Sequence, residues 1–249
     1  MNDNTRRLRI LLWNCCNGIS QKAQIDYFEA FKPDIAVIPE LKQGNVATLK
    51  PESSVWITNN HSNPSPKGLG VLAYNGYQLT ELPRDDEMEI FIPLKASRAD
   101  FTFTLLAVWN FYSACKQGRF KDVKGKHCLE FCAMKHYLPI LSDPTLIVGD
   151  WNLGPTFAKG DFLEILRILG ENGIKSLYHE HYGLHPETSA NPTFRSTRNS
   201  LHHLDHMFGS KYFYENMNGL QIDSFENVVL SDHAPLLLEI NTQSIASCA

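Results

Sequence analysis

The stretch TLIVGDWNLGP, residues 145–155, is the most informative part of this sequence about its fold. Its first four residues are apolar or β-branched, a short run that suits a buried β-strand. The run leads directly into Asp150 and Asn152, so the strand delivers a carboxylate and a carboxamide at its end. Because α/β proteins collect ligand-binding groups in loops beyond strand ends, we expect chemistry at this point.

Other polar side chains follow apolar runs in the same way. Asn14 ends the run 8–13, and Glu40 follows the run 35–38. Asp205 lies in the strand candidate 203–208, and Asp232 with His233 precedes the candidate 236–240. Several such groups, far apart in sequence, predict one convergent site. Carboxylate and amide oxygens suit a hard cation such as Mg²⁺ or Mn²⁺.

The remaining pattern alternates strands and helices. Further strand-like runs occupy 55–58, 69–74, 90–94 and 101–109. We expect one helix capped by Ser20 and stopped before Pro33, a second over 128–138, and a third that opens with a capping box of Asp161 and Glu164. Without a repeat or linker, the chain 1–249 is predicted to be a single domain with its core at about 8–241 and flexible tails at 1–7 and 242–249.

Five short segments occur in a fixed order along the chain: LLWN (11–14), IPELK (38–42), IVGDWNLGP (147–155), HLDHMF (203–208) and LSDHAP (230–235). In this order they resemble the endonuclease/exonuclease/phosphatase superfamily, which includes deoxyribonuclease-like and abasic-site-endonuclease-like enzymes, and within it a minimal single-domain member of bacterial type. The resemblance implies an α/β fold, a four-layer α/β/β/α sandwich of two packed mixed β-sheets flanked by helices, with the active site at one end.

The resemblance also implies a metal site. Glu40 would be the main ligand of Mg²⁺ or Mn²⁺, with Asn14 beside it and Asp232 near or on the metal. Lys42, two residues after Glu40, matches a lysine that supports the ligating glutamate in some members.

Four further residues would carry the reaction. Asp150 would orient and deprotonate the attacking water, and Asn152 would hold a phosphoryl oxygen. His233, paired with Asp205, would stabilise charge on the phosphate. The physics agrees, because hydrolysis of an anionic phosphodiester needs charge neutralisation, an aligned water and a stabilised leaving oxygen.

Four residues are predicted to bind substrate. Trp109 and Asn110 end the run 101–109 where many relatives place a histidine or tyrosine that donates to the phosphate. An indole N–H is only a donor, so Trp109 either bonds a phosphate oxygen or fills the core. Arg195 and Arg198, in PTFRSTRN, offer the guanidinium fork that grips phosphate oxygens.

The segment before Asp205 differs from the abasic-site enzymes, since His202, His203 and Leu204 stand where those enzymes carry an aromatic residue. Specificity for abasic sites is therefore not supported. The residues that follow Asn152 and surround Asp205 also differ from those of the inositol polyphosphate 5-phosphatases.

The net charge is −4, from 23 Lys and Arg against 27 Asp and Glu, so nucleic-acid binding must be local. One basic segment, Lys116, Arg119, Lys121, Lys124 and Lys126, either tracks a phosphate backbone or is an ordinary solvated loop. No apolar run reaches about 18 residues and the start MNDNTRR lacks a signal-peptide core, so we expect a soluble cytoplasmic protein with no membrane or obligate protein partner.

The six cysteines form neither a disulfide framework nor paired zinc knuckles. His127, Cys128, Cys132 and His136 could hold a soft metal from one helix face, although small apolar cysteines on such a face are usually core.

We therefore expect a Mg²⁺-dependent hydrolase of phosphate esters, foremost a phosphodiesterase or nuclease acting on DNA or RNA. A phosphatase acting on a small soluble or lipid phosphomonoester is the alternative. A non-catalytic nucleic-acid-binding or partner-binding module ranks below both, because Glu40, Asp150 and His233 are all present. The sequence leaves open DNA against RNA, and endonuclease against exonuclease action.

Overall fold

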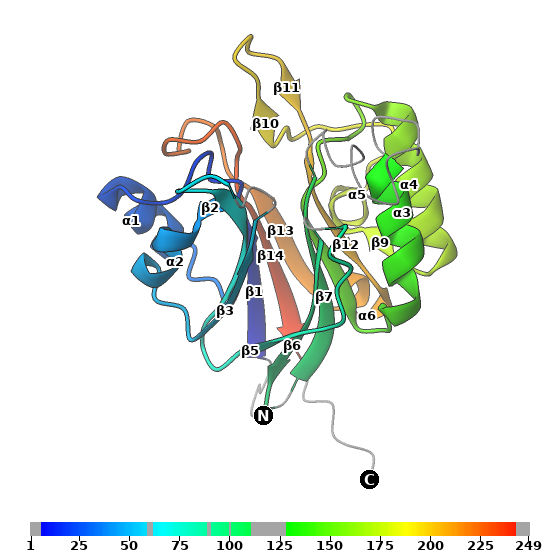
Figure 1. Cartoon of the computed structure of the whole chain (residues 1–249). Helices are drawn as coiled ribbons and strands as arrows, with labels where there is room; N and C mark the ends of the chain where they lie inside the picture. The colour runs from blue at the N-terminus through cyan, green and yellow to red at the C-terminus, as the bar shows by residue number, and fades with distance from the viewer. Residues whose placement is uncertain (1–5, 59–61, 89–90, 100, 111–127, 243–249) are drawn as a thin grey trace, which may run out of the picture.

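Two six-stranded β-sheets pack face to face in this computed structural model, which describes residues 6–58, 62–88, 91–99, 101–110 and 128–242 (Figure 1). The first sheet has the order β13 (Met217–Ile222), β14 (Leu236–Thr242), β1 (Arg6–Leu12), β2 (Ile35–Lys42), β4 (Lys67–Ala73), β3 (Ser53–Ile57). The second has the order β5 (Gln78–Glu81), β6 (Phe91–Arg98), β7 (Phe101–Trp109), β8 (Thr145–Asp150), β12 (Asp205–Gly209), β9 (Lys175–Ser176).

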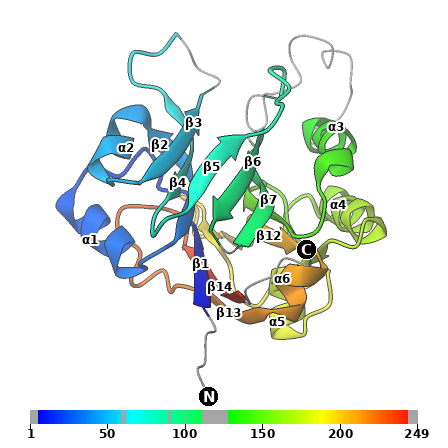
Figure 2. The ribbon, with the colours of Figure 1, turned by 90° about the horizontal axis from the view of Figure 1, so that it is seen from below.

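Both sheets are mixed. The pairs β1–β2 and β7–β8 are parallel and their other neighbours are antiparallel. Helices α1 (Lys22–Ala30) and α2 (Gln43–Thr48) cover the outer face of the first sheet, and α3 (Cys128–Tyr137) and α4 (Lys159–Glu171) cover that of the second (Figures 1 and 2). The predicted four-layer sandwich is confirmed.

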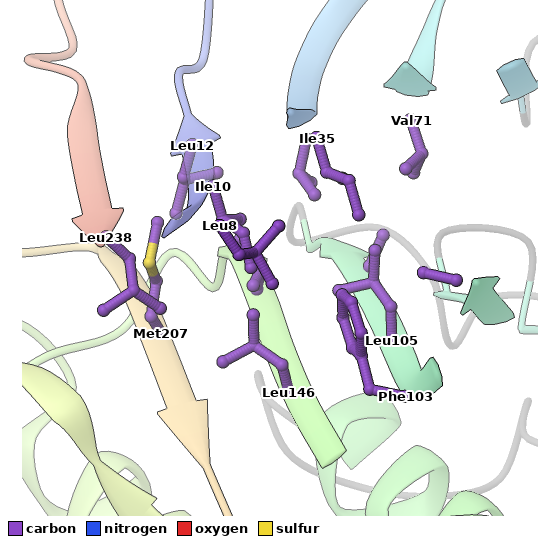
Figure 3. Close-up of a cluster of buried hydrophobic side chains, with 14 of the residues drawn as sticks. Leu8, Ile10, Leu12, Ile35, Val71, Phe103, Leu105, Leu146, Met207 and Leu238 are labelled. Atoms are coloured by element: carbon purple, nitrogen blue, oxygen red, sulfur yellow. The ribbon is translucent and has the colours of Figure 1, made fainter. Parts of the chain in front are cut away.

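Successive side chains of each strand point to opposite faces of its sheet, which explains how each sheet packs against the layers on both sides. On β1, Leu8, Ile10 and Leu12 point into the core between the sheets, and Leu11 points to the α1 layer. On β8, Leu146 and Val148 face the same central core, which Figure 3 shows in part, while Ile147 faces α3 and α4. Strands buried on both faces read as continuous apolar runs, which is why the sequence revealed them.

Several predicted boundaries are wrong. Ser20 does not cap the first helix, which begins at Lys22 while Gln24 Oε1 accepts the N–H groups of Ser20 and Gln21. Asp161 does not open a capping box, because α4 begins at Lys159 and places Asp161 inside its first turn. That helix also continues one residue past Gly170.

The chain ends are more ordered than predicted where they are described. Arg6 and Arg7 belong to β1 and pair with Thr242 and Asn241 of β14, so the sheet extends beyond the expected core at both ends. The other parts of the predicted tails, 1–5 and 243–249, lie outside the described residues.

The sequence missed mainly short or polar elements. They include α2, β5, β9, β13, α5 (Leu177–Tyr182), α6 (Lys211–Glu215) and a hairpin of β10 (Phe194–Arg195) and β11 (Leu201–His202). This hairpin rises from the end of the sandwich opposite the N-terminus (Figure 1). Among the described helices, none has the length and apolar character needed to cross a bilayer.

Candidate functional site

A cleft of about 490 Å³ opens at the end of the sandwich where most of the predicted residues meet. Strands β1, β2, β7 and β8 end at this edge, and the antiparallel strands β4, β12 and β14 begin there. The lining residues are Asn14, Glu40, Asn63, Lys67, Trp109, Asp150, Asn152, Phe194, Asp232 and His233. The convergence expected from strand ends is therefore present.

Asp150 sits at the centre of the cleft wall. In register it pairs with Trp109 on β7 and with Asp205 on β12. Its Oδ1 accepts the backbone N–H of Asn152 at 3.0 Å, and its Oδ2 accepts the amide of Asn14 at 3.1 Å. The Asn14 bond joins the two sheets, so the carboxylate of one sheet is held by a side chain of the other.

Burial raises the pKa of Asp150 above its ordinary value, and the nearby Asp205 carboxylate raises it further. His233 and the two hydrogen-bond donors from Asn152 and Asn14 act in the opposite direction. The carboxyl group is therefore more basic than an exposed aspartate, which suits a group that takes a proton from water.

His233 and Asp205 form a buried pair behind Asp150. The Nδ1 of His233 lies 2.7 Å from Oδ2 of Asp205, and the two side chains are 6% and 1% exposed. Burial by itself lowers the pKa of His233, but the carboxylates of Asp205, Asp150 and Asp232 outweigh it and raise the pKa to about 9. The imidazole is therefore cationic at neutral pH, as the sequence interpretation requires.

Glu40 occupies a special backbone position. It has a φ of 62° and lies where the β2–β4 register shifts between Ile38 and Leu41. A positive φ is uncommon for a non-glycine residue and costs backbone strain; nine other described non-glycine residues share it, and of these Asn152 also lines the cleft. The kink turns Glu40 into the cleft, where its carboxylate forms an ion pair with the Nζ of Lys67 on β4.

The described residues contain one cluster of three that could hold a metal through side-chain atoms within 4.8 Å of one another, namely Asp150, Asp205 and His233. However, His233 and Asp205 already satisfy one another by a hydrogen bond, and a cationic imidazole is a poor ligand. Glu40, Asp232 and Asn14 line the open cleft and offer only oxygen donors, so they fit a hard cation better.

Two predicted substrate-binding residues are directed away from the cleft. The side chain of Asn110 is buried and donates to Glu130 of α3 and, at 3.3 Å, to the carbonyl of Trp151. Arg195 places its guanidinium over the ring of Phe225, 5.1 Å from the ring centroid, in a neighbouring groove. The structure therefore does not favour direct contact between either side chain and a phosphate in the cleft.

Asn152 lines the cleft but its amide is already engaged. It donates to the backbone carbonyl of Asn110 and to Oδ2 of Asp150 at 3.2 Å, with a φ of 50°. In this arrangement it orients Asp150 directly, and it would have to release a bond to donate to a phosphoryl oxygen.

Trp109 is 7% exposed, packs in the central core and also lines the cleft, so its position is compatible with either role that the sequence left open. Arg198 lies exposed at the tip of the hairpin. The basic residues Lys116, Arg119, Lys121, Lys124 and Lys126 and the histidine His127 lie outside the described residues.

Sequence reasoning did not identify Lys67 or Asn63. Lys67 begins β4 and pairs in register with Lys42, so it lies one strand away from the lysine that was predicted to support Glu40. Lys42 does not line the cleft, and its aliphatic chain lies beside Gly18. A lysine at the start of a strand carries no distinguishing pattern, so only the sheet register reveals its partner.

The soft-metal alternative has no support in the described part of α3, where Cys132 packs against the outer core.

No protein-family model and no curated protein matches the chain by sequence. Solved structures match it by shape. The endonuclease domain of TRAS1, a telomere-specific non-LTR retrotransposon, is 18% identical, with a TM-score of 0.69 over 95% of this chain and 99% of that domain. The AP endonuclease LMAP from Leishmania major is 15% identical, with a TM-score of 0.72 over 96% and 89%.

A third match is a 3′ phosphatase, NExo from Neisseria bound to a product DNA hairpin, with 15% identity and a TM-score of 0.64 over 94% of this chain and 100% of that one. At these identities the comparisons establish the fold alone, which is deoxyribonuclease-like.

Proposed function

We propose that this chain, which has the deoxyribonuclease-like fold, is a metal-dependent phosphodiesterase that acts on nucleic acid. The observation that carries the proposal is the joint placement of Asp150, His233 and Glu40 in one cleft, each with a partner that fits its role. That the three solved structures are described as two endonucleases and a DNA-bound phosphatase supports the same reaction class.

In the proposed reaction Asp150 accepts the proton of the attacking water. Its oxygens are fixed by Asn14 and Asn152, so the base is oriented before substrate arrives. His233, cationic and held by Asp205, lies opposite the charge that develops on the phosphoryl oxygens. Trp109, at the end of β7, can donate its indole N–H to the same group.

Glu40, with Asp232 and Asn14, would hold the divalent cation, Mg²⁺ or Mn²⁺. A cation bound there would neutralise phosphate charge during hydrolysis. Lys67 balances the Glu40 carboxylate in the cleft and places a second positive charge where a phosphate would enter. Residues of both sheets share the central core, and we propose that the chain acts as a single domain in a soluble protein.

The deciding experiment is cleavage of supercoiled plasmid and of labelled DNA and RNA oligonucleotides in Mg²⁺. We expect cleavage that EDTA abolishes and that His233→Ala and Asp150→Asn each lower at least 100-fold, consistent with loss of electrostatic or general-base catalysis. The control is His181→Ala, which alters an exposed histidine of α5. Active His233→Ala protein of unchanged fold would contradict the assignment.

A phosphomonoesterase is the second candidate, because one structural match is a 3′ phosphatase. Oligonucleotides ending in a 3′ phosphate separate the two functions. Release of phosphate without shortening of the strand would favour the phosphatase, and shortening or nicking would favour the nuclease.

A further inference from the structure

A second groove, of about 650 Å³, lies directly beside the catalytic cleft. It is bounded by the β10–β11 hairpin, by the segment 190–192 and by the loop that follows β13. The proposed reaction uses none of its side chains.

One wall of the groove contains a cation–π contact. The Arg195 guanidinium lies over the ring of Phe225, and Arg195 is exposed while Phe225 is half-buried. An arginine plane supported by an aromatic ring is a surface on which nucleobases stack, and the cation adds attraction for an anionic strand.

The remaining walls combine apolar surface with amide groups. Leu201, Pro192 and Ile222 line the groove, and Leu201 is 50% exposed, a large exposure for an apolar side chain next to a site. Asn191 and Asn199 add hydrogen-bonding groups at its edges. This mixture matches a base, which has two apolar faces and a polar rim.

The acidic residues of the groove are engaged with other groups or face water. Asp223 accepts hydrogen bonds from the hydroxyl of Tyr27 at 2.6 Å, from its neighbour Ser224 and from Asn227 at 2.8 Å. Glu226 is exposed, so its charge is screened by water.

The groove and the cleft are connected through strand β10. Phe194 of this strand lines the cleft, and the next residue, Arg195, lines the groove. The N–H of Arg195 donates to the carbonyl of Asp232 at 2.9 Å, and the ring of Phe194 lies 4.8 Å from that of His233. Consecutive side chains of a strand point to opposite faces, so the cleft and the groove lie on the two sides of β10, and a nucleic-acid strand held at His233 would reach the groove by crossing the hairpin.

We propose that this groove holds the unpaired base of a nucleotide that flanks the scissile phosphate, so that the substrate is single-stranded or frayed at that position. A base inserted between the hairpin and the loop cannot remain in a duplex stack. The inference rests on the proposed function, because it assumes that the strand is anchored in the cleft.

The first test measures binding in EDTA, where no cleavage is expected, using a fluorescent 12-nucleotide single strand and the matching duplex. Arg195→Lys keeps the charge but loses the stacking plane, and Phe225→Ala removes its support. We expect each to raise the Kd for the single strand about 5- to 150-fold, the range of one lost base stack, with the duplex Kd unchanged. Arg167→Lys on the exposed face of α4 is the matched control.

The second test uses single strands that lack one base at successive positions around the cleavage point. Wild-type protein should lose affinity at one position, and Arg195→Lys should be insensitive there. Phe225→Leu, which keeps apolar volume, and a thermal melt of each variant separate loss of stacking from loss of folding.

Two results would overturn the inference while leaving the proposed function intact: cleavage with single-strand affinity unchanged in Arg195→Lys and Phe225→Ala, or equal loss of affinity for single strand and duplex. Hydrolysis of a small phosphate ester with no binding of either oligonucleotide would instead overturn the nucleic-acid substrate, and the groove assignment with it.

Discussion

Individual residues at this site act through partners that lie far away in sequence. Asp150 is held by Asn14, 136 residues earlier, and His233 is held by Asp205, 28 residues earlier. Each bond is buried, so removal of one partner leaves a buried charge or donor unsatisfied. Substitutions here should therefore affect the chemistry of the neighbour as well as that of the altered residue.

The Lys67–Glu40 ion pair gives the first prediction. A cation that binds Glu40 must compete with the Lys67 ammonium, so Lys67→Met should strengthen Mg²⁺ binding severalfold in a calorimetric titration. The same variant should raise KM for an oligonucleotide, because the cleft loses a positive charge.

Lys42→Met provides the comparison, since Lys42 faces Lys67 across the β2–β4 register. If Lys42→Met alters Mg²⁺ affinity more than Lys67→Met does, the original prediction that Lys42 supports Glu40 is right and the assignment to Lys67 is wrong.

Two buried histidines behind the site lead to a prediction about the stability of the protein at acidic pH. Burial lowers the pKa of His203 to about 4 and lowers that of His206 well below its ordinary value; nearby Asp205 opposes the shift at His203, and His179 adds to it. Above pH 6.5 the imidazole rings of both histidines are neutral in the folded and in the unfolded protein. As the pH falls below 6.5, the unfolded chain binds protons that the folded chain excludes, so stability should fall by up to about 1.4 kcal/mol per pH unit for each histidine.

Urea unfolding at pH 7 and at pH 5.5 measures the change in stability, to which the raised pKa values of Asp150 and His233 contribute with the opposite sign. His206→Phe removes the His206 contribution and should therefore shift the difference between the two pH values in favour of stability at pH 5.5, since the ring stacks on Phe162 and Phe208 and a phenyl group can keep that packing. It will also lose the bond to the Leu153 carbonyl and so lower stability at both pH values. An unchanged difference between the two pH values would refute the explanation.

At the scale of elements, the close approach of β7 and β8 positions Asp150. A Cβ added to Gly149 would lie 1.9 Å from the carbonyl oxygen of Val108, so only glycine fits immediately before the Asp150 carboxylate. Gly149→Ala must displace the strand, and overpacking of this kind costs ~1–3 kcal/mol. We expect a lower Tm and a large loss of activity.

The matched control is Gly219→Ala on β13, where an added Cβ meets no atom within 4 Å. It should leave Tm and activity close to wild type. If the two alanine variants melt alike, the tight contact between β7 and β8 does not determine the position of Asp150.

At the scale of the whole molecule, charge limits how nucleic acid is bound. The net charge of −4 excludes broad attraction of a polyanion, and the described cations at the site are few, chiefly Lys67, His233 and Arg195. About three released counterions give a slope of about −2 in log Kobs against log salt for a single strand.

Filter binding or anisotropy between 50 and 300 mM KCl measures that slope. If the basic residues of 116–126 also track the backbone, the slope becomes steeper by about 0.7 for each contact and returns to about −2 when these residues are replaced by Gln. A slope near zero would contradict binding through phosphates altogether.

The central strands and the polar residues at their ends could be predicted from the sequence alone. Strands buried on both faces form continuous apolar runs, so the candidate residues Asn14, Glu40, Asp150, Asp205 and His233 stood out at the ends of such runs, and the structure brings them together at one end of the sandwich. Short polar elements such as the β10–β11 hairpin left no such signal, because their stability comes from contacts with distant segments.

The pairing of groups across the site, by contrast, follows only from the folded chain. The register of β2 and β4 gave Glu40 the partner Lys67, and the packing of α3 drew the Asn110 side chain away from the cleft. The folding of β10 against the 232–233 segment turned Arg195 toward Phe225 and created the second groove. Side-chain direction depends on sheet register and on neighbours remote in sequence, and no local pattern encodes either.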